Sequence, residues 1–171
     1  KSIVSIEGLG ASPTMLAKSA GKSINERLEG WADELRKMSG RTPRRYPTLE
    51  DAFSRMQDEN PHLSEDQARH LTVHGASQNE DGTFSWKFDN YVRIFRPYGL
   101  SPEEIHYLWS RIICPTLLIR GTESWASDPI EDGRFSSFQN AEVANIDGAG
   151  HWAHHDRLDV FLDLVRKHLD K

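Results

Sequence analysis

The sequence predicts an α/β fold in which parallel strands are flanked by helices, and three observations support this. Three short runs rich in aliphatic residues have the length of buried strands: Ile3–Ile6, 114–121 and 142–146. Long connections with helical patterns separate the first run from the second, which favours parallel pairing. The last run ends in a glycine-rich turn followed by an amphipathic helix, the alternation typical of α/β proteins.

Composition narrows the classes of function. The chain has 171 residues, enough for one domain with a core, and a net charge of −5, which disfavours nucleic-acid binding. No apolar run is long enough to cross a bilayer, so no membrane association is expected. The single cysteine, Cys114, excludes an internal disulfide, and no signal peptide is recognisable. These features lead us to expect a cytoplasmic protein.

The first strand leads into a loop and then into a long helical region. Ile3–Ile6 is followed by Glu7-Gly8-Leu9-Gly10, a sequence typical of a strand ending in a turn. Helix starts are then predicted where a capping residue precedes an acidic or amide side chain three positions later; these caps are Ser23, Thr48, Ser64 and Ser101. Phe84, Trp86 and Phe88 alternate with polar residues and predict an extended segment between the third and fourth of these helices.

His151 stands at the end of the last strand and is the strongest candidate for a functional residue. Gly148 and Gly150 allow the chain to turn sharply off the strand, and His151 follows at once. The helix after it is predicted to be amphipathic, with these apolar residues on one face: Leu158, Phe161, Leu162, Val165 and Leu169. Open α/β sheets place ligands and catalytic groups beyond the carboxyl ends of their strands, where His151 lies.

Two other interpretations of His151 remain open. It could be a loop histidine without a role, or it could join His154 and His155 in a metal site. Zinc sites need three or four suitable ligands, and the only cysteine, Cys114, has no ligand pattern around it, so we expect no metal. Neither a phosphate-binding loop nor a dinucleotide fingerprint is present, so we expect no cofactor.

Taken together, Ile3–Ile6 with its loop, the helical region and the Gly148-Ala149-Gly150-His151-Trp152 segment closely resemble the α/β-hydrolase superfamily. The resemblance covers nearly the whole chain but only the C-terminal half of the family fold. It implies a core strand and loop at 1–13, an inserted helical cap at 14–110, and core strands, histidine loop and C-terminal helix at 111–171. The Glu7–Gly10 loop and the cap look most like the serine-hydrolase-like branch.

The resemblance implies that His151 is the general base in the hydrolysis of an ester-like small molecule, with Trp152 packed beside the substrate. No G-x-S-x-G nucleophile elbow and no oxyanion loop occur in the sequence. The nucleophile is therefore expected from a missing N-terminal half. Two alternatives stay open: an aspartate nucleophile, as in dehalogenases and epoxide hydrolases, and a non-catalytic fragment or interaction module.

The resemblance leaves three candidates for the acid that orients His151. Many family members carry an aspartate three residues after the glycine that ends the next-to-last strand, but here that position is Ser124. Glu123 and Asp128 lie nearby as alternative acids. The arrangement of haloalkane dehalogenases and coelenterazine luciferases places a glutamate at the end of the strand before the cap, where Glu7 stands. Glu7 is favoured because a buried carboxylate needs a partner, and an imidazolium suits it.

Three strands alone would leave the edge of Ile3–Ile6 unpaired together with an apolar face. Such an edge is a template for pairing with another chain. We therefore expect either a complementary N-terminal hydrolase half or self-association through this edge, with a small molecule as substrate.

Overall fold

The computed structural model describes residues 1–94 and 96–170, which form two compact units. Unit 1 combines Lys1–Gly21 with Leu100–Lys171, and unit 2 is Lys22–Gly99. Each unit has buried apolar residues of its own and is described separately.

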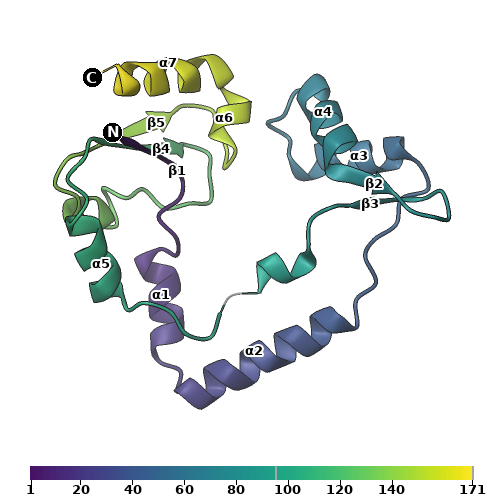
Figure 1. Cartoon of the computed structure of the whole chain (residues 1–171), viewed down its shortest axis with the longest axis horizontal. Helices are drawn as coiled ribbons and strands as arrows, with labels where there is room; N and C mark the ends of the chain where they lie inside the picture. The colour runs from purple at the N-terminus through teal and green to yellow at the C-terminus, as the bar shows by residue number, and fades with distance from the viewer. Residues whose placement is uncertain (95, 171) are drawn as a thin grey trace. The chain divides into compact units, whose positions relative to one another are not determined.

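Unit 1 is built on a three-stranded parallel sheet of β1 (Ile3–Ile6), β4 (Thr116–Gly121) and β5 (Ala141–Ile146), in the order β1-β4-β5 (Figure 1). Ile3 lies opposite Thr116, and Thr116 lies opposite Ala141. The predicted parallel α/β sheet is thereby confirmed. The central strand β4 is the most buried of the three because it has a neighbour on both sides.

The described part of unit 1 includes these helical segments: α1 (Pro13–Ala20), α5 (Pro102–Ser110), the 3-10 turn η2 (Arg134–Ser137), α6 (Ala153–Asp156) and α7 (Leu158–Leu169). Helix α7 lies along one face of the sheet (Figure 1), where Phe161, Leu164 and Val165 pack against a core containing Leu117, Ile119 and Ile146. Leu158 and Leu169, on the apolar face predicted for this helix, are 48% and 59% exposed, whereas His168 in the last turn is buried.

Unit 2 contains α2 (Ile24–Ser39), α3 (Leu49–Glu59), α4 (Glu65–Gly75), a hairpin of β2 (Ala76–Gln78) and β3 (Phe84–Trp86), and the 3-10 turn η1 (Asn90–Arg93). The serine or threonine before each α-helix caps it in a complete capping box, and Ser101 does the same for α5 in unit 1. All four predicted helix starts are confirmed. The extended segment is confirmed for Phe84 and Trp86 but ends before Phe88.

The boundaries of unit 2 differ from those of the helical cap that the sequence suggests, 14–110. Helices α1 and α5 contribute to the unit that holds the sheet, so the inserted unit is narrower, 22–99. Trp109 of α5, for example, stacks on Phe138, the residue that follows η2, with ring centroids 5.4 Å apart. The role of unit 2 as a cap stays a prediction. In the described parts of both units, no helix is long and apolar enough to cross a membrane.

Candidate active site

Three loops meet at the carboxyl ends of the three parallel strands. Glu7 follows β1, Ser124 and Trp125 follow β4, and His151 follows β5. Since adjacent parallel strands end at the same edge of a sheet, residues far apart in the sequence converge there. The convergence brings Glu7 and His151 into contact across 144 positions of sequence.

The Glu7 side chain is buried, with 1% of its surface exposed, and its carboxylate accepts three hydrogen bonds. Oε1 accepts from the backbone N–H of Gly121 at 2.9 Å, and Oε2 accepts from Ser124 Oγ at 2.6 Å. Oε2 also contacts Nδ1 of His151. These partners compensate for the loss of water that makes an unpaired buried carboxylate costly.

The backbone of Glu7 adopts a left-handed conformation with φ of +46°. This region costs an L residue about 1–2 kcal/mol. Glu7 is the only non-glycine residue with positive φ in the part of the chain that the structure describes. Strain of this kind is retained where surrounding contacts hold it, and it concentrates at functional sites.

His151 is placed by two features of its glycine-rich turn. Gly148 has a φ of +66°, and the backbone N–H of Gly150 donates to Asp156 Oδ2 at 2.8 Å. The imidazole is 39% exposed, and the indole of Trp125 lies against it with ring centroids 4.6 Å apart. One ring nitrogen of His151 is therefore held by a buried carboxylate while the side chain stays accessible.

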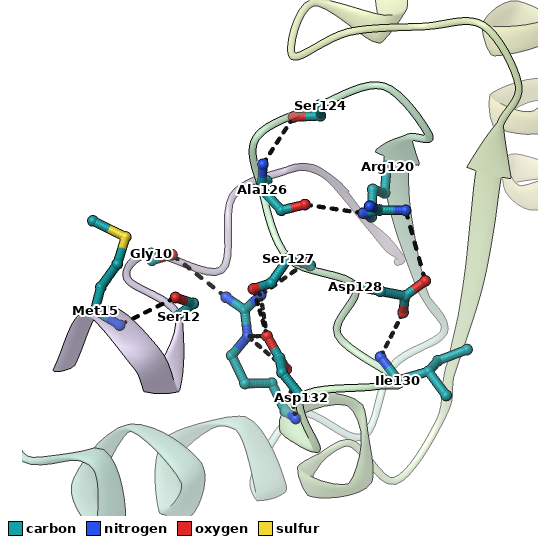
Figure 2. Close-up of polar contacts among 11 residues, drawn as sticks. Gly10, Ser12, Met15, Arg120, Ser124, Ala126, Ser127, Asp128, Ile130 and Asp132 are labelled. Carbon is teal, nitrogen blue, oxygen red and sulfur yellow. Dashed lines mark hydrogen bonds and ion pairs between the residues drawn. The ribbon is translucent and has the colours of Figure 1, made fainter. Parts of the chain in front are cut away.

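The loop after β4 is braced by its own polar groups (Figure 2). Arg120 Nε donates to the carbonyl of Ala126 at 3.1 Å, and the N–H of Ala126 donates to Ser124 Oγ at 3.1 Å. Further along, Arg134 binds Asp132 and Ser127. Burial would raise the pKa of Asp132, but the hydrogen bonds from Arg134 and Ser127 outweigh it and the pKa is lowered. The loop therefore presents Ser124 and Trp125 from a fixed frame.

The alternative acids lie on this same loop but have other contacts. The carboxylate of Asp128 faces Arg120 at 3.7 Å and accepts from the N–H of Ile130 at 2.8 Å (Figure 2). The backbone N–H of Glu123 donates to the carbonyl of Ala149 at 2.9 Å, which ties the loop to the histidine turn. Among the candidate carboxylates, that of Glu7 contacts His151.

The rings of Trp125 and Trp152 have different neighbours, and a role for Trp152 beside a substrate stays a prediction. Trp152 directs its ring toward His155, with centroids 5.8 Å apart, whereas the ring on His151 belongs to Trp125. Sequence reasoning did not single out Trp125, because no local pattern marks which residue of the loop after β4 will lie on the ring of His151. Trp125 and Glu7 also line a cavity of about 150 Å³ with Ser5, Leu118 and Met15 on its walls.

His154 is a second histidine of the turn with an unusual environment. Its Nδ1 is buried and has no hydrogen-bond partner within the described chain, and its ring lies 4.3 Å from that of His155. Burial, followed by the charge of His155, lowers the pKa of His154. Within residues 1–94 and 96–170, no group of three or more His, Cys, Asp and Glu is arranged to hold a metal ion.

The fold is shared with solved hydrolase structures. A thioesterase domain from the curacin biosynthetic pathway superposes with a TM-score of 0.74 and 23% identity, over 98% of this chain and 58% of that one. An esterase from Mycobacterium tuberculosis superposes with a TM-score of 0.64 and 16% identity, over 98% of this chain and 51% of the esterase chain. A peroxisomal alpha-beta-hydrolase from Saccharomyces cerevisiae superposes with a TM-score of 0.68 and 12% identity, over 98% of this chain and 45% of the yeast chain.

The chain thus spans about half the length of the solved structures it matches. Its fold is that of an α/β-hydrolase, in the part that corresponds to the C-terminal half, as the sequence resemblance predicted. No protein-family model matches the chain, and no curated protein matches its sequence.

Proposed function

We propose that this chain supplies the histidine and the acid of an α/β-hydrolase that cleaves an ester-like small molecule. The contact between His151 Nδ1 and the buried carboxylate of Glu7 is the observation that supports this most directly. The thioesterase and esterase names among the structural neighbours support acyl-transfer chemistry of the same kind.

In the proposed mechanism the Glu7 carboxylate can only accept a hydrogen bond, so Nδ1 of His151 carries the proton between them. The lone pair of the imidazole is then on Nε2. A nucleophile hydroxyl would give its proton to Nε2 as it attacks the carbonyl carbon, and the resulting imidazolium would be stabilised by Glu7. Nε2 would next return the proton to the leaving alcohol or thiol as the tetrahedral intermediate collapses.

The nucleophile and the oxyanion donors are proposed to come from a complementary N-terminal half. The open edge of β1 offers a pairing site for it, because β1 has a neighbouring strand on one side alone in the described sheet. The half-length match to complete hydrolases supports this arrangement.

The test uses this chain purified together with any polypeptide that binds it, identified by native mass spectrometry. With p-nitrophenyl acetate as the probe, His151→Ala is expected to lower the rate of hydrolysis at least 10³-fold, since triad histidines contribute this much or more. His155→Ala removes the same side chain four positions further along the chain; it is the matched control and should retain activity.

The outcomes separate the three candidate functions. Labelling of the bound polypeptide by a fluorophosphonate supports a serine nucleophile. Hydrolysis that depends on His151 without labelling favours the aspartate nucleophile of the dehalogenase and epoxide-hydrolase type. Full activity in His151→Ala contradicts the proposal, and a complex with no hydrolase activity leaves the non-catalytic interaction module.

A further inference from the structure

We propose that Ser124 is a positioning residue that fixes the Glu7 carboxylate against His151. The proposal rests on the proposed function in one respect, that the Glu7–His151 pair is catalytic. Ser124 itself touches Glu7 rather than the site where a substrate would react, and it is absent from the walls of the neighbouring cavity.

The direction of the hydrogen bonds follows from the chemistry of the groups. Ser124 Oγ accepts the N–H of Ala126 at 3.1 Å and lies 2.6 Å from Glu7 Oε2. A carboxylate donates nothing, so the single proton of the hydroxyl points to Oε2. Hydrogen bonds to an ionised acceptor are among the strongest in proteins.

Both oxygens of Glu7 are held from one turn of the chain. The N–H of Gly121 binds Oε1, Ser124 Oγ binds Oε2, and the N–H of Ser124 closes the turn on the carbonyl of Gly121 at 3.2 Å. Two donors on one rigid turn fix the rotation of the carboxyl group about its last torsion. Without the hydroxyl, the turn keeps one donor, on Oε1, and Oε2 is held by Nδ1 of His151 alone, so the carboxyl group is less firmly fixed.

The frame behind Ser124 makes its position independent of Glu7. Arg120 holds the carbonyl of Ala126 at 3.1 Å and also faces Asp128, as Figure 2 shows. The Arg120 side chain is 19% exposed and that of Asp128 is 12% exposed, so this brace is shielded from solvent. The braced loop therefore fixes Ser124, and the hydrogen bond from Ser124 Oγ fixes the Glu7 carboxylate.

The experiment follows the Nδ1–H proton of His151 by NMR in the full chain labelled with ¹⁵N-histidine, which needs no nucleophile and no substrate. We expect a low-field resonance in the wild type. Ser124→Ala should speed exchange of this proton with water about tenfold, because a charge-assisted hydrogen bond that positions its acceptor is lost. Ser124→Thr keeps a hydroxyl and should restore slow exchange.

Ser136→Ala is the matched control, since Ser136 is exposed and its Oγ donates to the carbonyl of Gly133 instead. It should exchange as the wild type does. If Ser124→Ala fails to fold by circular dichroism, Ser124→Cys replaces it, and its weaker thiol donor should give an intermediate rate. Unchanged exchange in the alanine or cysteine variant, or equal acceleration in Ser136→Ala, overturns the proposal.

A kinetic measurement on the active complex completes the test. Ser124→Ala should lower kcat about tenfold with KM unchanged, because Ser124 acts on Glu7 rather than on substrate. If His151→Ala has no effect on hydrolysis while the NMR result holds, the catalytic role fails and the positioning of Glu7 stands. If hydrolysis depends on His151 but Ser124→Ala leaves proton exchange unchanged, the catalytic role of His151 stands and the positioning of Glu7 by Ser124 fails.

Discussion

At the scale of single residues, the candidate site is defined by one buried acid and the groups that hold it. Glu7 is enclosed almost completely, and its three partners come from the end of β4, the loop after it and the histidine turn. The place of His151, on a glycine turn after the last strand, was predictable because glycine turns and a following helix are local signals. The partner of His151 was one of three open choices in the sequence, since the burial of Glu7 depends on strands that are distant along the chain.

His154 gives a prediction on pH dependence at this scale. Its folded pKa is lowered, chiefly by burial, so the unfolded chain binds more protons as pH falls below the usual value of 6.5. The free energy of unfolding should therefore decrease as pH is lowered from 6.5 toward the folded pKa. Urea unfolding at several pH values should show this slope in the wild type and a smaller one in His154→Gln.

The exposed turn residue His62 provides the control for this measurement. His62→Gln should keep the wild-type slope. Equal slopes in the wild type and His154→Gln would show that burial of His154 does not contribute to the acid sensitivity of the fold.

At the scale of elements, the close approach of two loops decides the geometry of the site. The turn after β4 and the turn after β5 are joined by the Glu123–Ala149 backbone hydrogen bond of 2.9 Å. Gly121 lies at their contact, where a Cβ would stand 2.3 Å from the carbonyl oxygens of both Ala149 and Gly150. The sequence shows Gly121 as the end of a strand, but the reason that it must be glycine is the neighbouring loop.

Gly121→Ala is expected to destabilise unit 1 by about 1–3 kcal/mol, as overpacking against rigid backbone does. The histidine turn would have to move, so His151 should also lose its contact with Glu7. Hydrogen exchange of the β4 amides measures the first effect, and the His151 Nδ1–H resonance measures the second.

Gly30→Ala is the matched control on helix α2. An added Cβ meets nothing within 4 Å there, so alanine should stabilise the helix by about 0.5–1 kcal/mol. Exchange of the α2 amides should slow accordingly. Normal protection of β4 in Gly121→Ala would contradict the close contact between the two loops.

At the scale of the whole molecule, the sheet of unit 1 has an edge strand that could pair with another chain. Strand β1 pairs with β4 and leaves its other edge without a strand in the described chain, and Ile3 is 37% exposed at its start. Natural sheets protect such edges, commonly with charged side chains. The segment Ile3–Ile6 carries none.

We predict that the isolated chain self-associates through this edge. Ile3→Lys should reduce the association measured by sedimentation velocity, because a charge at an edge strand opposes pairing. Leu169→Lys, which places the same charge at an exposed apolar residue of α7, is the control and should associate as the wild type does. A monomeric wild type, or equal loss of association in both variants, would contradict pairing through β1.

The sequence by itself determined the helix caps, the three strands, the glycine turn and His151, because these depend on hydrogen bonds and backbone angles within a few residues. The four capped helix starts show this, each decided by a side chain and an N–H three positions apart. Only the tertiary structure decided that Glu7 lies on His151, that the ring of Trp125 lies against it, and where unit 2 begins and ends. The register of parallel strands sets these contacts, and it joins residues more than a hundred positions apart that no local pattern connects.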